Sequence, residues 1–440
     1  MLTRRSSSRT WVSSVFFCLF VLVLFASPDT LLKNKPEKEI FANGMTFIYQ
    51  KDNTSATTVT QILIQGGRRG EIDGKEGVAF LITRLCLDLP DQQQLQRLMN
   101  QATNRTFFAR EDFSIVKISC LSENLEEAIK LSAQILKDPL ISGLRIERTK
   151  ELMNHYRKLQ ADEPINLAHA AALDTFFSGS PYASTAYGTK ESLKNIKKRD
   201  VEDYFQKYVK AENMIVTVST DLEKDKVLSI MQPYLEEFPT GKPEKIDPAS
   251  FSPVEEISLS LEKDTAQALV YMAFPLPKIS ERGYVLSMML QDLLGKGINS
   301  KLWSLRTEKK LAYIVNSRAF LLKDGGILDA YLETDQSKQE SASAELKKTI
   351  EYLYQNGISE EELSIAKIHS KGMAIRENET KDEKTYNLAF LEGLGLGYDF
   401  LNRILAEIEA TTLEEFNAFI LEVLNPEKAV SITVGPTRML

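Results

Sequence analysis

Histidine and cysteine are scarce in this 440-residue chain. It has three histidines, and no two of them have the spacing of a metal-binding pair: His155, His169 and His369. Its three cysteines are too few for a disulfide scaffold or a multi-cysteine zinc module: Cys18, Cys86 and Cys120. We expect Cys86 and Cys120 to be buried free thiols, since each falls in an apolar segment.

An excess of positive charge is also absent. Lys and Arg number 54 and Asp and Glu number 61, so the formal net charge is −7. No basic stripe with interleaved aromatic residues is present, which excludes an electrostatic nucleic-acid binder. Apolar residues make up 43% of the chain and charged residues 26%. This composition is ordinary for a globular protein and too apolar for a disordered one.

The N-terminus has the pattern of an export signal. Residues 1–10 hold three arginines and no acid, and an apolar run of 16 residues follows at 11–26. A basic region before a short apolar region is typical of a signal peptide, so we assign residues 1–30 to one. Leu24 is a poor residue three positions before a cleavage site, so an uncleaved membrane anchor is the alternative. We expect the rest to lie in the periplasm or cell envelope, either free or tethered to the inner membrane.

The remaining chain divides into two halves around a proline-rich stretch. Four prolines fall within residues 237–256, a stretch without apolar periodicity, which is typical of an interdomain linker. We therefore predict an N-terminal domain over 38–240, a linker over 241–258 and a C-terminal domain over 259–440.

The two halves repeat one order of elements. A β-rich segment at 57–67 precedes an apolar helical pattern at 76–89, and the segments at 265–275 and 281–295 do the same. Both halves also end with a helix, a turn and a strand. This order predicts an α+β fold made by duplication, in which each of two homologous domains is an antiparallel sheet covered by helices.

Short motifs along both halves resemble the insulinase/pitrilysin-type zinc peptidases, in particular their bacterial short-chain subgroup, from about residue 40 to 436. In the first half the matching pieces are Gly66-Gly67-Arg68-Arg69-Gly70-Glu71, Gly77-Val78-Ala79, Ser180-Pro181-Tyr182 with Gly188-Thr189-Lys190-Glu191-Ser192-Leu193, and Tyr208 with Asn213-Met214. In the second half they are Leu294-Gly295, Asn299-Ser300-Lys301-Leu302, and Leu305-Arg306 with Leu311-Ala312-Tyr313. The resemblance implies that this chain forms half of a peptidase clamshell.

The family's zinc-binding residues are missing. Active members carry H-x-x-E-H on the helix after the first strand, where two imidazoles grip the metal and the glutamate takes a proton from the bound water. The matching positions here are Phe80, Thr83 and Arg84. Phe80 cannot ligate zinc, Thr83 is no general base, and Arg84 is a permanent cation that would repel the metal. We expect these three residues to form a packing face, with Arg84 reaching solvent or an acid.

The family's third ligand, a glutamate, should fall near residues 154–156, which read Asn154-His155-Tyr156. Since no carboxylate or second histidine stands beside it, we interpret His155 as a partly exposed helix residue. An active peptidase with an unorthodox metal site would need ligands that the sequence does not supply. The chain is therefore expected to bind no metal or cofactor of its own.

A second set of family residues is intact. The resemblance implies that Arg306 and Tyr313 hold substrate backbone oxygens and stabilise the charge that develops on the scissile carbonyl, facing a zinc site. We expect a short helix capped by Asn299 or Ser300 to place Arg306 beside Tyr313. The alternative is that Arg306 pairs with Glu308 or another acid and that Tyr313 lies on a sheet face.

In the family some short chains work as pairs, in which one carries H-x-x-E-H and the other carries the Arg/Tyr set. The resemblance thus predicts a catalytically silent subunit of a heteromeric zinc peptidase, which supplies Arg306 and Tyr313 to a zinc-binding partner. Its substrates would be unfolded peptides, and the zinc would be held by the partner. The competing interpretation is a non-enzymatic scaffold or a chaperone-like peptide binder of the cell envelope.

Overall fold

A computed structural model describes residues 31–89, 91–242, 245–249, 251 and 255–436. The predicted signal peptide or anchor lies outside the described residues. Within them, no helix combines the length and the apolar character that crossing a membrane requires.

The first half contains a six-stranded sheet in the order β1-β2-β6-β3-β5-β4. Its strands are β1 (Glu37–Ile40), β2 (Thr46–Lys51), β3 (Thr57–Gln65), β4 (Asn104–Ala109), β5 (Phe113–Leu121) and β6 (Met214–Thr220). Only β2 and β6 run parallel to each other, while the other neighbours are antiparallel.

The second half contains a five-stranded sheet in the order β7-β11-β8-β10-β9. Its strands are β7 (Ile257–Glu262), β8 (Ala268–Leu276), β9 (Ile314–Leu322), β10 (Gly325–Thr334) and β11 (Val430–Gly435). Here β7 and β11 form the parallel pair. The order repeats that of the first sheet without β1, so the predicted duplication and α+β class are confirmed. The sheets are mixed rather than purely antiparallel, because the last strand of each half pairs in parallel with an early one, β6 with β2 and β11 with β7.

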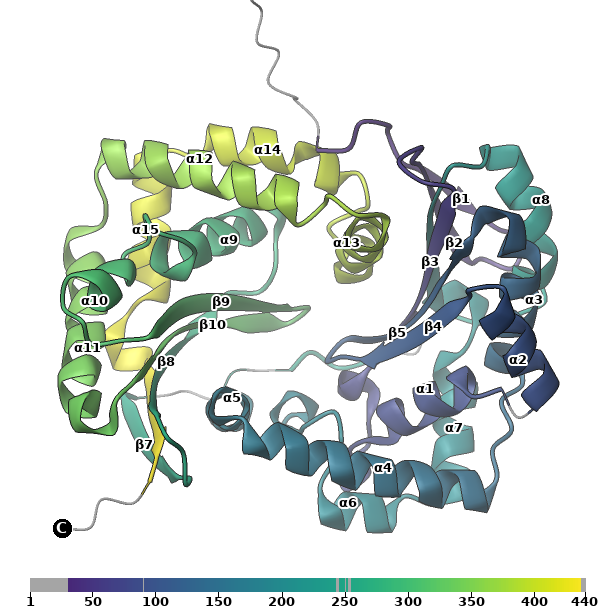
Figure 1. The fold of residues 1–440 in the computed structure, drawn as a ribbon, viewed down its shortest axis with the longest axis horizontal. Coiled ribbons are helices and arrows are strands. Elements are labelled where there is room, and N and C mark those ends of the chain that lie inside the picture. Colours follow the sequence, from purple (N-terminus) through teal and green to yellow (C-terminus); the bar gives the residue numbers. More distant parts are fainter. Residues whose placement is uncertain (1–30, 90, 243–244, 250, 252–254, 437–440) are drawn as a thin grey trace, which may run out of the picture.

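Each half has its own helices, most of which cover the outer face of its sheet (Figure 1). Those of the first half are α1 (Val78–Leu87), α2 (Gln92–Asn100), α3 (Leu125–Lys137), α4 (Gly143–Asp162), α5 (Pro164–Phe176), α6 (Lys190–Asn195), α7 (Lys198–Tyr208) and α8 (Lys224–Leu235). Those of the second half are α9 (Glu281–Gly295), α10 (Trp303–Thr307), α11 (Gln339–Asn356), α12 (Glu360–Arg376), α13 (Lys381–Leu394), α14 (Phe400–Ala410) and α15 (Leu413–Val423).

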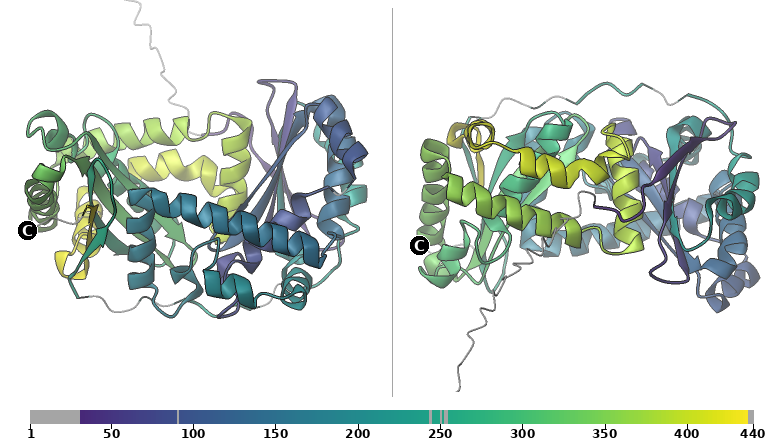
Figure 2. Two further views of the ribbon diagram at one scale, coloured as in Figure 1. Left: turned by 60° about the horizontal axis from the view of Figure 1, so that its bottom comes forward. Right: turned by 90° about the horizontal axis from the view of Figure 1, so that it is seen from above.

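One helix of each half crosses to the other half's sheet. Helix α13 packs on β3 and β6, and helix α5 packs on β8 and β11. The two helices occupy equivalent places in the duplicated order, each directly after a long helix (α4 or α12). Figures 1 and 2 show α13 and α5 between the two sheets. This exchange joins the halves into one body.

Buried ion pairs reinforce the junction. Arg69 of the first half donates to both carboxylate oxygens of Asp324 in the second, from Nε at 2.6 Å and from a terminal nitrogen at 3.2 Å. Asp112 accepts the backbone N–H of Lys323 at 2.9 Å, and Lys384 Nζ lies 2.7 Å from Asp52. Because the planar fork of arginine fits a carboxylate at two points, the first of these contacts also fixes orientation.

The expectation for the two cysteines is confirmed. Cys86 and Cys120 are buried free thiols. Gly295 of the Leu294-Gly295 motif allows α9 to approach β9, because a Cβ there would lie only 2.1 Å from the Ser317 nitrogen. Leu302, rather than Asn299 or Ser300, immediately precedes α10, and no side chain caps that helix. The Ser300 hydroxyl instead donates to the carbonyl of Gly297 at 2.8 Å, so the capping expectation is wrong.

Candidate functional site

Helix α1 is the element that carries the metal in active relatives, and its start is held by buried polar contacts. Glu71 Oε1 accepts the backbone N–H groups of Gly77 at 3.0 Å and Ala79 at 2.9 Å. Helix starts leave such N–H groups without partners, so a carboxylate there stabilises the helix. Burial nevertheless raises the pKa of Glu71 to about 8.

The loop before α6 also holds the start of α1. Gly188 has a φ of +63°, and a Cβ there would lie 2.2 Å from the carbonyl oxygen of Glu76. The hydroxyl of Ser192 donates to the same oxygen at 2.9 Å. Only glycine fits so close an approach with a positive φ. These contacts give a structural reason for the glycine and serine of this motif.

Four aromatic rings fill the position that the family uses for zinc. Phe80 of α1 is 6% exposed. Its ring centre lies 4.9 Å from that of Phe107 on β4, 5.0 Å from that of Tyr187 and 6.2 Å from that of Tyr156 on α4. Tilted rings at such distances are favourable contacts. We call Phe80, Phe107, Tyr156 and Tyr187 the aromatic cluster.

The other two motif positions, Thr83 and Arg84, make contacts within or at the end of α1. Thr83 is buried, and its hydroxyl donates to the carbonyl of Ala79 at 2.6 Å. Arg84 forms an ion pair with Asp88 at 2.9 Å, and its guanidinium carbon lies 5.9 Å from the ring centre of Phe107. The expectation of a packing face with Arg84 paired to an acid is therefore confirmed.

The region expected to hold a third ligand contributes none. His155 is exposed on α4, and its ring is tilted 6.2 Å from that of Tyr156. Tyr156 is the residue that turns toward α1 and joins the aromatic cluster.

The residues at this position do not fit a zinc ion. Zinc takes nitrogen, thiolate or carboxylate ligands, and the aromatic cluster offers only rings and phenols. Across the part of the chain that the structure describes, no three His, Cys, Asp or Glu side chains come together as a metal site. We derive no reaction step through a metal in this chain.

The second candidate site lies at the corner between α10 and β9. The chain turns sharply there, because Lys310 has a φ of +55° and the Leu311 N–H donates to the carbonyl of Leu305 at 2.9 Å. A positive φ outside glycine is uncommon. Contacts from β10 hold the end of the turn, where the Tyr313 N–H donates to the carbonyl of Glu333 at 2.9 Å.

Arg306 and Tyr313 are both exposed at this corner, with separate partners. The guanidinium carbon of Arg306 lies 4.9 Å from the ring centre of Trp303. Tyr313 is 51% exposed, and its hydroxyl donates to Asp335 Oδ1 at 3.0 Å. That hydrogen bond raises the pKa of Tyr313. Among the described residues, no hydrogen bond joins Arg306 to Tyr313, and no ion pair joins Arg306 to Glu308.

The corner faces away from the first half of the same chain. Helix α10 lies at the outer end of the second half in Figure 1, and the turned view in Figure 2 agrees. The second sheet stands between it and the aromatic cluster, so the two candidate sites of one chain are far apart.

Several residues around both sites could not be identified from sequence alone. No motif marks Phe107, Tyr187 or Trp303. In the fold, Phe107 and Tyr187 contact Phe80, and Trp303 contacts Arg306. The one available signal is the position of Trp303, three residues before Arg306, which places both on one helix face.

Comparison with known families supports the resemblance. Residues 46–190 match the family described as Insulinase (Peptidase family M16), and residues 195–369 match the Peptidase M16 inactive domain. Together these matches span most of the chain.

Individual relatives extend the similarity. The non-peptidase homolog YmxG of Helicobacter pylori is 30% identical over 315 residues, which cover 70% of this chain and 72% of that protein. Zinc protease PqqE of the same organism is 22% identical over 371 residues, or 79% and 81% of the two chains. The crystal structure of a peptidase M16 inactive domain from Pseudomonas fluorescens has the same fold, with a TM-score of 0.84, 20% identity, and coverage of 92% of this chain and 98% of that one. This chain therefore belongs to the insulinase family of peptidases, M16, and lacks the family's H-x-x-E-H motif.

Proposed function

We propose that this protein is a catalytically silent subunit of a heteromeric zinc peptidase. It would supply Arg306 and Tyr313 to the zinc site of a partner that carries H-x-x-E-H. The observation that carries the proposal is the contrast between the two sites: rings fill the first, while the second keeps its arginine and tyrosine exposed.

The surroundings of Arg306 suit a group that receives substrate. The guanidinium carbon lies over the Trp303 ring, and the N–H groups make no hydrogen bond within the described residues. Among the described residues, no carboxylate forms an ion pair with it. Its planar fork can therefore donate to a peptide carbonyl oxygen and stabilise the negative charge that develops there.

Tyr313 would act as the second donor. Its raised pKa keeps the phenol protonated at neutral pH. The Tyr313 hydroxyl donates its hydrogen bond to Asp335 in this structure. A substrate oxygen would have to replace that carboxylate as the acceptor. Since Asp335 lies at the surface, this exchange breaks no buried contact.

The outward direction of the corner supports a partner rather than a site within one chain. Helicobacter pylori has both the zinc protease PqqE and the non-peptidase homolog YmxG, each similar to this chain. An organism that holds one chain of each kind has the components of such a pair. We further propose unfolded peptides as substrates and the periplasm or cell envelope as the location, with the N-terminal segment as a membrane tether.

A non-enzymatic scaffold or chaperone-like binder is the second candidate. The aromatic cluster is equally consistent with a scaffold and with a silent peptidase subunit, because its packed rings stabilise the fold in both. The exposed Arg306 and Tyr313 distinguish the two, since a scaffold has no need of them.

Reconstitution tests the proposal. This chain and an H-x-x-E-H family member from the same genome should be purified separately and then mixed, with an unstructured fluorogenic peptide as the substrate. We expect a stable complex that cleaves the peptide, while neither chain does so alone. A partner that is fully active alone and unchanged by this chain would contradict the proposal.

A further inference from the structure

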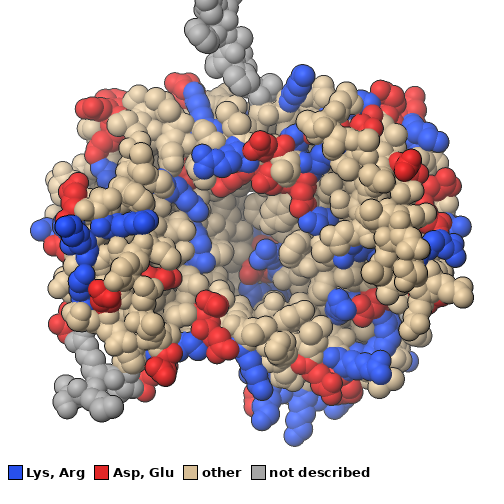
Figure 3. Space-filling view, in the orientation of Figure 1, with Lys and Arg blue, Asp and Glu red and all other residues tan. Residues whose placement is uncertain are grey.

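A cavity of about 400 Å³ lies between the two halves of the chain. Strands β3, β4 and β5 line it on one side and helices α9, α12, α13 and α14 on the other. The space-filling view in Figure 3 shows the molecule hollowed between its halves. The volume is within the range of small-molecule sites. The cavity contains no residue of the aromatic cluster or of the α10 corner, although Phe108 in its wall follows Phe107 on β4.

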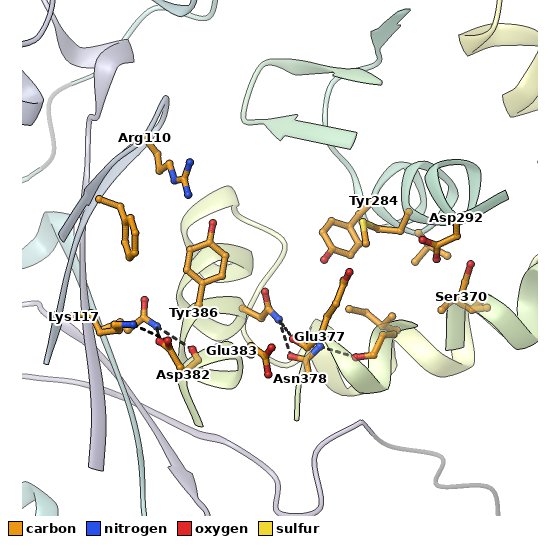
Figure 4. Close-up of a pocket in the computed structure, with 18 residues that line it drawn as sticks. Arg110, Lys117, Tyr284, Asp292, Ser370, Glu377, Asn378, Asp382, Glu383 and Tyr386 are labelled. Atoms are coloured by element: carbon orange, nitrogen blue, oxygen red, sulfur yellow. Dashed lines mark hydrogen bonds and ion pairs between the residues drawn. The ribbon is translucent and has the colours of Figure 1, made fainter. Parts of the chain in front are cut away.

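Two acids and a hydroxyl lie at the second-half end of this cavity (Figure 4). Asp292 of α9 is only 1% exposed, and its one hydrogen-bond donor of normal geometry is the Gln291 amide at 3.4 Å. Ser370 of α12 is 2% exposed, and its hydroxyl lies near enough to Asp292 to lower the pKa of that acid as a hydrogen-bond donor. The carboxylate of Glu377, at the end of the same helix, receives no hydrogen bond from the described residues.

The positive charges near these acids stay at a distance. Burial raises the pKa of Asp292, while hydrogen bonds from Ser370 and Gln291 and the charges of His369 and Lys296 act to lower it. Burial and the charge of Asp292 raise the pKa of Glu377, which Lys296 and Arg376 act to lower. Within the described residues, no cation comes close enough to form an ion pair with either carboxyl group. A buried acid without such a partner is costly in its charged form.

The rest of the wall is mostly apolar or aromatic, apart from exposed Arg110 at the first-half end, whose guanidinium carbon lies 5.6 Å from the ring centre of Phe108. Tyr284 and Tyr386 present rings, and the aliphatic lining is Val285, Met288, Ala374, Ile404 and Ile408. Lys117 at the far end is neutralised by Asp382 at 2.7 Å. Buried Gln61 donates its amide hydrogens to Asp382, while its oxygen Oε1 has no partner among the described residues. At the second-half end of the cavity, the groups open to a ligand are therefore mainly acceptors.

We propose that the cavity binds an organic cation, an ammonium or guanidinium group on an apolar chain, with the charged end between Asp292 and Glu377. The ammonium would donate hydrogen bonds to the two carboxylates and to Ser370. The Tyr284 ring, toward which Glu377 points in Figure 4, would add a cation–π contact. The aliphatic residues would cover the apolar chain. A metal ion suits this wall poorly, because no third acidic, histidine or cysteine ligand joins the two acids in the described residues.

The same chemistry has two sources, a free amine and the lysine side chain of a peptide. Calorimetric titration of the isolated chain at pH 7.5 separates them. One arm compares n-hexylamine with n-hexanol, and the other compares a blocked tripeptide with central lysine and the same tripeptide with norleucine. In each pair the probes differ mainly by the charged group. We expect the cation of at least one pair to bind tenfold or more tightly than its neutral counterpart, as loss of a charge-assisted hydrogen bond implies.

Two isosteric variants locate the site. Asp292→Asn and Glu377→Gln should each weaken binding of the cationic probe about tenfold. Glu379→Gln removes the same charge from an exposed residue nearby and should leave binding unchanged. Glu377 is only half-buried, so its variant decides the matter if Asp292→Asn fails to fold. Equal binding of cation and neutral probe, no binding in either arm, or unchanged affinity in Glu377→Gln would each overturn the proposal. The test involves no partner chain, so it is independent of the proposed peptidase function.

Discussion

The guanidinium of Arg306 stacks on the indole ring of Trp303, with 4.9 Å between the guanidinium carbon and the ring centre. The two residues are three positions apart on α10, a helix of only five residues. An exposed arginine side chain samples many rotamers. The indole therefore limits where the guanidinium points, and Trp303 is a positioning residue for Arg306.

If Trp303 positions Arg306, Trp303→Leu should lower the peptidase activity of the complex between this chain and its zinc-binding partner. The variant keeps the positive charge of Arg306. An exposed cation–π contact contributes about 0.5–1 kcal/mol. We expect kcat of the complex to fall by roughly 2- to 5-fold. Restoring a ring with Trp303→Phe should recover part of the activity. A loss that Trp303→Phe leaves uncorrected, accompanied by a lower unfolding midpoint, would indicate a purely structural role.

The protein should contain no stoichiometric zinc. Phe80, Thr83 and Arg84 provide no ligand, and the aromatic cluster fills the space around them. Elemental analysis of protein purified without chelators should give well below one zinc per chain. One tightly held zinc per chain would show that a metal site exists elsewhere.

Phe80 should be a major contributor to stability. Replacing a fully packed phenylalanine by alanine costs about 3–5 kcal/mol, so Phe80→Ala should lower the free energy of unfolding by that amount. Phe108 on the same strand as Phe107 is 39% exposed and makes a matched control. We expect Phe108→Ala to cost about 1 kcal/mol or less. Urea unfolding measures both, and equal losses would contradict the assigned role of the aromatic cluster.

Asp112 should make stability depend on pH. Burial raises its pKa from 3.8 to about 6, although hydrogen bonds from Tyr182 and Lys323 oppose the rise. Between these two values the folded state binds more protons than the unfolded state, so stability falls as pH rises. The difference between the two pKa values of Asp112 corresponds to on the order of 3 kcal/mol in the free energy of unfolding. This stability is present below about pH 4 and lost as pH rises through 6.

Comparing wild type with Asp112→Asn isolates this effect, because the amide does not titrate. The stability of wild type relative to the variant should decline from pH 4 to pH 6 and level off above. Urea unfolding across this pH range gives the curve. A relative stability that is flat, or that rises with pH, would contradict the raised pKa.

The sequence was a good guide where local pattern and duplication act together. The repeated order of strand, turn and helix predicted two related halves, and both sheets have the same strand order. The Gly77-Val78-Ala79 motif placed α1 within one residue of its start. The charge of Arg84 predicted an acidic partner, which Asp88 provides one helical turn later.

What the sequence could not predict depends on contacts between distant segments. Phe80 meets Tyr187 only because Gly188 and Ser192 anchor their loop at Glu76. The exchange of α5 and α13 between the sheets has no local signal, since their apolar faces would suit either sheet. The cavity depends on this exchange, because α13 lines it opposite the strands of the first sheet. The lack of a cap on α10 reflects tertiary packing that replaces a local hydrogen bond.

The central claim is that Arg306 and Tyr313 complete a partner's active site. The most direct measurement is the rate of peptide cleavage by the mixed complex carrying variants of these residues, with complex formation followed by size-exclusion chromatography. Loss of an oxyanion-type donor costs roughly 10²–10³ in turnover, so Arg306→Ala should lower kcat by that factor while the complex still forms. Arg306→Lys should also be poor, because a point charge cannot replace the planar fork, and Tyr313→Phe should lose only what the hydroxyl contributes. A stable and fully active complex that carries both Arg306→Ala and Tyr313→Phe would contradict the claim.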